Sequence, residues 1–196
     1  TICLMALFMV LTIVGIRESS RVAVVIFLTH LASLTLLLLV GGIYLSTHGL
    51  QMLSQNLATP TESLPQALFF GFAAAMLGIS GFESSANFVE EQAEGVFPKT
   101  LRNMWIAVSV FNPAMTLLAL ALVPIDGAGA HRGNLLAHMG DLAGGRWLGL
   151  VISVDAMLVL SGAVLTSFVG VTGLVKRMTL DRVLPQFLLH SNRRGT

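Results

Sequence analysis

Charged residues are scarce in this sequence. Aspartate, glutamate, lysine and arginine make up 11% of its 196 residues, whereas hydrophobic residues make up 55%. An average soluble domain has about 25% charged residues, so this composition excludes an ordinary soluble fold. The net charge of +1 points to no particular partner, and we expect no nucleic-acid binding.

Cysteine and the common catalytic motifs are also nearly or wholly missing. The single cysteine, Cys3, cannot form a disulfide within the chain. The sequence has no G-x-S-x-G elbow, phosphate-binding loop, haem motif or cluster of metal ligands. We therefore expect neither an enzyme nor a bound metal or cofactor.

Long apolar runs dominate what remains. Residues 22–45 include no Asp, Glu, Lys or Arg, and at about 1.5 Å per residue such a helix crosses roughly 30 Å of hydrocarbon. Five runs of this kind predict an all-α, multi-pass integral membrane protein with five transmembrane helices. The predicted spans cover about 1–16, 22–45, 65–89, 103–125 and 147–175.

The links between these spans predict their orientation. Nine basic residues lie in the first, third and final links and two in the others; short cytoplasmic loops are enriched in Lys and Arg. Residue 1 then starts near the outer face of the cell inner (plasma) membrane. In the outer links, Thr61 or Ser63 can cap the third span, and a short surface helix is expected at about 134–139.

The chain opens at Thr1 inside an apolar stretch, without an initiator Met or a preceding basic region. This does not resemble a signal peptide. We expect the chain to be an internal piece of a longer membrane protein.

The third span contains a polar interruption, "LGISGFESSANFVEEQ" at 77–92. Gly78 and Gly81 weaken a helix, and Ser80 with Glu83 matches the S-x-x-E capping box that starts a new one. We expect two half-helices, roughly 65–77 and 81–92, whose adjoining ends present a negative and a positive dipole suited to a zwitterion. The alternative is a kinked continuous helix with Glu83 bonded to a neighbouring span.

Two further ionisable residues lie inside predicted spans, His30 and Asp155. His30 is either a hydrogen-bonded packing residue or a functional group, and Asp155 serves either ion coupling or a structural hydrogen bond. Helical spacing places His30 on one face with Ser33, Leu34, Leu37 and Gly41.

Three stretches of the sequence resemble the amino acid/polyamine/organocation (APC) permeases. The most specific is "GFESSANFVEEQ" at 81–92 followed by "GVFPKTLRNMW" at 95–105, which is similar to the sixth span of that family and the loop after it. "VGIRESSRVAVVIFLTHLA" at 14–32 resembles the junction of the fourth and fifth spans. "MTLDRVLPQF" at 178–187 resembles the loop after the eighth span, usually "ARDGxLP", but the basic residue follows Asp181 and the Gly is missing.

The resemblance covers the whole chain as spans four to eight of about twelve. It implies the LeuT-like inverted-repeat fold, with substrate at the bilayer midplane between broken helices. Leu77 and Ser80 then fall where carbonyls bind the substrate's amino group, and Gly78, Ile79 and Gly81 complete the unwound segment. Leu77 stands where many relatives have an aromatic lid, so that form of gating is not expected here.

The resemblance also implies where an ion would act. His30 falls where proton-coupled relatives often carry a Lys, and histidine as a residue type titrates near physiological pH. Ser161 falls near hydroxyls that hold sodium in sodium-coupled relatives, but it is a single hydroxyl and His30 supplies a competing charge. The pattern favours a proton over sodium, with His30, Asp155 and Glu83 as candidates for coupling or gating.

The resulting hypothesis is a secondary active transporter. It would move amino acids or related amines by alternating access, with a proton or by exchange, and its partners would be a small-molecule substrate and membrane lipid. The competing hypothesis is an ion channel or a non-transporting structural subunit, in which Glu83, Asp155 and His30 line a pore or cross-link helices.

Overall fold

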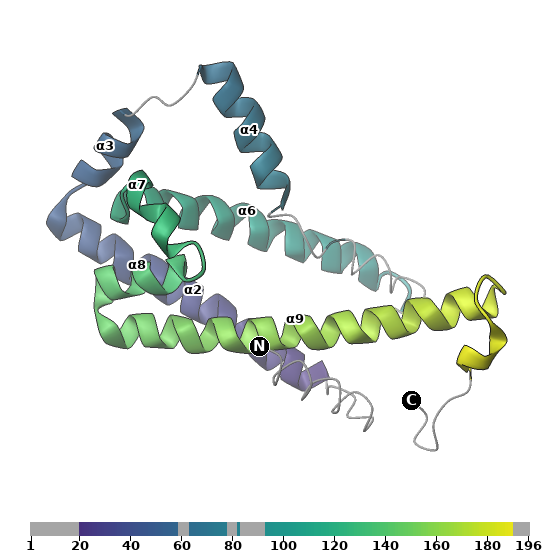
Figure 1. Cartoon of the computed structure of the whole chain (residues 1–196). Helices are drawn as coiled ribbons and strands as arrows, with labels where there is room; N and C mark the ends of the chain where they lie inside the picture. Colours follow the sequence, from purple (N-terminus) through teal and green to yellow (C-terminus); the bar gives the residue numbers. More distant parts are fainter. Residues whose placement is uncertain (1–19, 59–62, 78–81, 83–92, 190–196) are drawn as a thin grey trace. The chain divides into compact units, whose positions relative to one another are not determined.

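A computed structural model describes residues 20–58, 63–77, 82 and 93–189 of the chain (Figure 1). Within these ranges every regular element is a helix. The chain divides into two compact units, one of residues 30–155 and one formed by 1–29 with 156–196.

Three of the helices are long and apolar enough to cross a membrane, namely Val24–His48 within α2, all of α6, and Arg146–Val164 within α9. The third predicted span is described only as α4, whose apolar part is Leu64–Met76. The predicted span at 1–16 lies outside the described residues, so the count of five stays a prediction. The helices are α2 (Ser20–His48), α3 (Gln51–Ala58), α4 (Leu64–Leu77), α6 (Val96–Leu122), α7 (Ile125–Ala128), η2 (Gly129–His131), α8 (Leu135–Gly144), α9 (Arg146–Leu180) and η3 (Gln186–Leu189).

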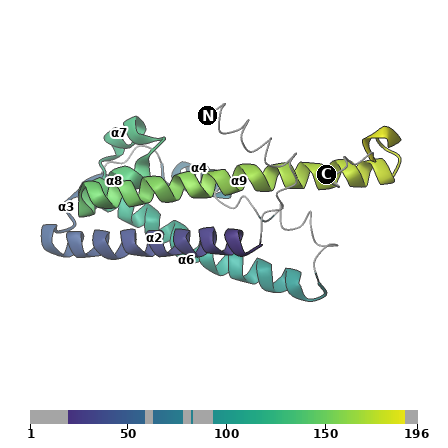
Figure 2. The ribbon, with the colours of Figure 1, turned by 90° about the horizontal axis from the view of Figure 1, so that it is seen from below.

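The core of the unit 30–155 forms where α2, α6, α8 and the start of α9 meet (Figure 2). Gly41 of α2 permits this packing, because a Cβ there would lie 2.7 Å from Leu118 Cδ1 of α6. The buried cluster consists of Leu37, Leu118, Leu122, Val123, Met139, Leu148 and Ile152.

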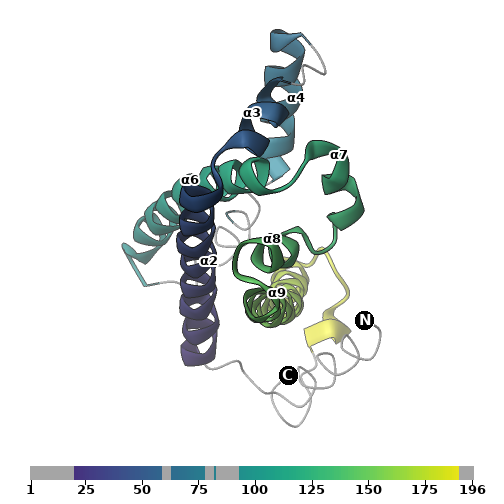
Figure 3. The same ribbon diagram turned by 90° about the vertical axis from the view of Figure 1, so that its left-hand side faces the viewer.

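Helices α8 and α9 form a tight hairpin, seen with α9 end-on in Figure 3. Gly145 joins them with φ of 80°, a left-handed conformation that only glycine adopts without cost. A Cβ on Gly140 would lie 3.0 Å from the backbone nitrogen of Gly149. Because neither Gly140 nor Gly149 has a side chain, the backbones of α8 and α9 can approach each other directly.

Helix α6 begins earlier than the apolar run that predicted a span at about 103–125. It starts at Val96, after Gly95, because Pro98 lies in the first turn, where a missing N–H costs nothing. The helix also runs through Pro113. The polar residues Lys99 and Arg102 thus belong to the helix, not to the link before it.

In the other unit, α9 continues to Leu180 and then reverses through a Schellman motif. Arg182 adopts φ of 60°, the Val183 amide donates to Met178 O at 2.9 Å, and the Arg182 amide donates to Thr179 O at 3.1 Å. These bonds satisfy carbonyls left over at the helix end. A non-glycine residue occupies the left-handed position.

Candidate functional site

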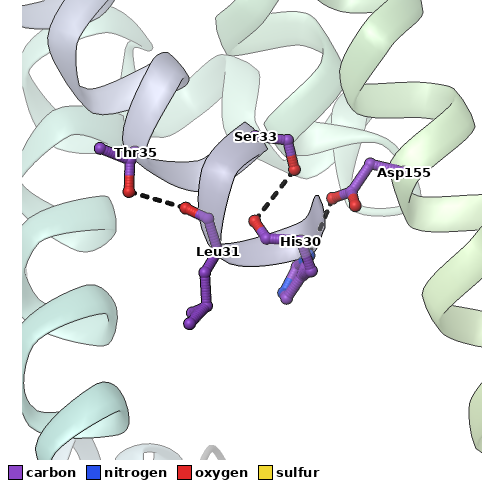
Figure 4. Close-up of polar contacts among 5 residues, drawn as sticks. All are labelled: His30, Leu31, Ser33, Thr35 and Asp155. Carbon is purple, nitrogen blue, oxygen red and sulfur yellow. Dashed lines mark hydrogen bonds and ion pairs between the residues drawn. The ribbon is translucent and has the colours of Figure 1, made fainter. Parts of the chain in front are cut away.

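His30 of α2 and Asp155 of α9 point toward one another inside the unit 30–155 (Figure 4). His30 Nδ1 lies 2.8 Å from Asp155 Oδ2, a distance typical of a charge-assisted hydrogen bond. The structure thus joins two residues that the sequence marks separately, 125 positions apart.

The pair lies at the edge of the hydrophobic core. Leu37 and Ile152 both belong to the buried core cluster. His30 lies two turns before Leu37 on α2, and Asp155 lies about one turn after Ile152 on α9. The face predicted for His30 is confirmed as the buried side of α2, since Ser33, Leu34, Leu37 and Gly41 are all buried. Packing of these two faces therefore brings the ionisable side chains together.

Asp155 is the more deeply buried member. Its side chain is 6% exposed, against 28% for His30, and its Oδ1 atom is buried without a hydrogen-bond partner among the described residues. A buried polar atom without a partner is unusual in a folded protein. One carboxylate oxygen therefore bonds to His30, whereas the other keeps unused hydrogen-bonding capacity.

The nearby hydroxyl groups do not donate to this oxygen. Ser33 Oγ donates to the carbonyl of its own helix at His30, at 3.0 Å, and Thr35 Oγ1 donates to Leu31 O at 2.7 Å (Figure 4). On α9, Ser153 Oγ donates to Gly149 O at 2.8 Å. Each hydroxyl satisfies a backbone carbonyl, as is common in apolar helices.

The net charge of such a pair depends on the protons that it holds. A buried ion is stable only when it is paired or neutralised. With one proton between them, His30 and Asp155 have no net charge, whereas losing it leaves a buried anion and gaining a second leaves a buried cation. Each proton gained or lost thus changes the net charge of a site that packs two long helices.

Two of the other predicted site residues, Leu77 and Ser161, are described by the structure. Leu77 is the last described residue of α4, while Gly78, Ile79, Ser80, Gly81 and Glu83 lie outside the described residues. Ser161 is half-buried on α9 in the other unit. The substrate segment and the sodium-site remnant stay predictions.

Among the described residues, no group of three or more His, Cys, Asp or Glu side chains could hold a metal ion. Two buried polar residues are not marked by the sequence, Thr179 of α9, which is 0% exposed, and Asn56 of α3, which is 9% exposed and makes contacts between distant segments. Neither the residue type nor the spacing of Asn56 separates it from the neighbouring glutamines, so no sequence signal marks it.

Comparison with known proteins addresses the whole chain. The sequence model of the family described as amino acid permease matches residues 1–196. Searches of curated proteins and of solved structures gave no match. The match over the full length confirms the resemblance drawn from the motifs, and this chain belongs to the amino acid permease family.

Proposed function

We propose that this chain forms part of a secondary active transporter that moves amino acids or related amines by alternating access. The observation that carries the proposal is the family match over residues 1–196. Membership of that family and three long apolar helices support an integral membrane protein that handles amino acids. The inner (plasma) membrane is the location that we propose for it.

The proposed substrate site is the backbone of residues 77–81. Two half-helices meeting there would leave carbonyls near Leu77 and Ser80 for the amino group of the substrate. Gly78, Ile79 and Gly81 would keep this segment unwound. The sequence supports this site through its glycines and the capping box formed by Ser80 and Glu83, with Glu83 as a proton-sensitive brace.

The proposed coupling site is the pair His30 and Asp155. The contact of 2.8 Å and the partnerless Oδ1 of Asp155 support it, because proton uptake or release there changes a buried net charge. Such a change alters the packing of α2 against α9, and this is a physical route from proton binding to helix movement. A sodium ion near Ser161 is the less favoured alternative.

The family match supports this proposal over an ion channel or a structural subunit. In either alternative, His30 and Asp155 would only line a pore or cross-link helices. Members of a permease family are expected instead to bind a substrate and to carry it across the membrane in repeated cycles.

The proposal is tested by reconstituting the full-length protein in liposomes and offering a panel of labelled amino acids and amines. Proton, sodium and counter-substrate gradients are imposed one at a time. We expect saturable uptake of at least one compound under a proton or counter-substrate gradient. If no compound shows saturable uptake or exchange under any of the three gradients, the proposed function is wrong.

A further inference from the structure

The side chain of Asn56 connects two distant segments of the unit 30–155. Its Nδ2 group donates to Leu120 O at 2.7 Å and to Val123 O at 2.9 Å, and its Oδ1 accepts from the Ile125 amide at 3.2 Å. Asn56 belongs to α3, in the link between α2 and α4, whereas the three partners form the corner between α6 and α7 (Figure 1). One amide therefore makes three bonds across 64 to 69 positions of sequence.

The chemistry of the corner explains why an amide is needed. In a continuing helix, Leu120 O would accept from the residue four positions later, but that residue is Pro124, which has no N–H. Val123 is extended, with φ of −117° and ψ of 129°, so the chain leaves the helix and its carbonyl is also left over. Asn56 supplies both donors.

The same side chain satisfies the first amide after the proline. The Ile125 N–H begins α7 and has no carbonyl of its own helix to reach, and Asn56 Oδ1 accepts it. An aspartate would place a second oxygen against the two carbonyls, and an apolar residue would leave all three backbone groups without a partner. Asparagine therefore matches this corner in donors and acceptor.

The three hydrogen bonds of Asn56, which we call the clamp, join the two links that lie on the predicted outer face. On one side, α3 leads into α4 and so toward the proposed substrate segment at 77–81. On the other side, α7 and α8 lead into α9, which carries Asp155. An attachment between α3 and the α6–α7 corner makes the two links move together.

We propose that Asn56 is a positioning residue of the transport cycle, which holds α3 to the α6–α7 corner so that both outer links move as one body. The inference rests on the proposed function, because it assigns Asn56 a role in turnover. Asn56 does not contact the His30–Asp155 pair or belong to the proposed substrate segment.

The test compares Asn56→Asp and Asn56→Leu with the control Ser54→Ala in the reconstituted full-length protein. Ser54 lies on the same helix, and its hydroxyl donates to Gln51 O within that helix. Hydrogen exchange followed by mass spectrometry reports on residues 51–58 and 120–128. Loss of hydrogen bonds worth about 1 kcal/mol each predicts roughly fivefold faster exchange of the Ile125 amide in Asn56→Leu, and no change in Ser54→Ala.

Transport gives the second readout. Per folded transporter, we expect both Asn56 variants to lower the maximal rate of substrate exchange several-fold while leaving the apparent substrate affinity unchanged. Asn56→Asp should recover part of its rate, relative to Ser54→Ala at the same pH, as the pH is lowered, because a protonated carboxyl can donate one bond. A merely structural residue would lower the yield of folded protein without this pH-dependent recovery.

The outcomes separate the clamp from the proposed function. Unchanged hydrogen exchange at 120–128 in both Asn56 variants would overturn the clamp. Faster exchange with an unchanged maximal rate would overturn the positioning role. If Asn56→Leu does not fold, the pH comparison with Asn56→Asp decides the question. No transport by the unaltered protein would remove the role together with the proposed function, while hydrogen exchange would still report on the clamp itself.

Discussion

His30 Nδ1 lies 2.8 Å from Asp155 Oδ2, and the second oxygen of the same carboxylate is buried without a partner among the described residues. A carboxylate in this setting depends on one histidine for its compensation. The contact is thus both a structural link between α2 and α9 and a site whose charge changes with one proton.

Removing His30 alone should destabilise the protein more than removing both members of the pair. His30→Leu leaves Asp155 buried and uncompensated, which costs about 3–5 kcal/mol of unfolding free energy. The double variant His30→Leu/Asp155→Leu removes the buried charge as well. Its free energy of unfolding should therefore fall clearly less than that of His30→Leu. Unfolding of the full-length protein in mixed micelles measures both values.

The control for this pair is His48→Leu, at the exposed C-terminal end of the same helix. Its ring stacks on Tyr44 with the ring centroids 4.0 Å apart, so we expect a loss of only about 0.5–1.5 kcal/mol there. A double variant that is destabilised as much as His30→Leu, or more, would contradict this prediction, because removal of the buried carboxylate would then bring no relief.

Replacing His30 by glutamine should separate coupling from substrate exchange. Glutamine can still donate a hydrogen bond to Asp155 but cannot gain a proton. We therefore expect accumulation driven by an imposed pH gradient to fall to background in His30→Gln, while exchange at equal pH persists. Ser33→Ala, on the same helix face, should keep both activities, and undiminished accumulation by His30→Gln would reject proton coupling through this residue.

The hairpin of α8 and α9 should not tolerate a side chain at Gly140. The added Cβ would lie 3.0 Å from Gly149 N and 3.1 Å from Gly149 Cα, so the backbones must separate. We expect Gly140→Ala to lower the free energy of unfolding by about 1–3 kcal/mol. Gly133→Ala is the matched control, because a Cβ at Gly133 meets nothing within 4 Å, and equal stability of the two variants would contradict this packing.

Replacing Arg182 by glycine should stabilise the protein. It holds a left-handed conformation with φ of 60° at the end of α9, where the related loop pattern has a Gly after the Asp. Relief of the left-handed cost exceeds the added entropy of the unfolded chain, so Arg182→Gly should stabilise the protein by about 0.5–1 kcal/mol. Thermal unfolding of Arg182→Gly and Arg182→Ala checks this, and a stabilisation by alanine equal to that by glycine would point to the arginine charge instead.

Hydrophobic periodicity predicted what depends on local sequence. The apolar runs gave three long helices, and the spacing from His30 identified the buried face of α2 through Leu37 and Gly41. Helix ends were less predictable. Helix α6 starts at Val96, well before the apolar run at about 103, and α9 carries Lys176 and Arg177 beyond the apolar run.

Contacts between distant segments could not be predicted. The sequence marks His30 and Asp155 as unusual because ions are rare in apolar helices, but only packing of α2 against α9 makes them partners. Asn56 carries no such mark, since asparagine is common in polar links. Its role depends on carbonyls released at the α6–α7 corner, and no pattern around Asn56 itself encodes them.

The measurement that tests transport most directly is substrate counterflow. Liposomes that contain the full-length protein are loaded with an unlabelled amino acid and diluted into a trace of the same labelled compound, with no ion gradient. A carrier that works by alternating access predicts a transient accumulation of label inside above its equilibrium level, saturable by external substrate. Label that only rises to equilibrium, whatever is loaded inside, would show a channel or no transport and would contradict the account.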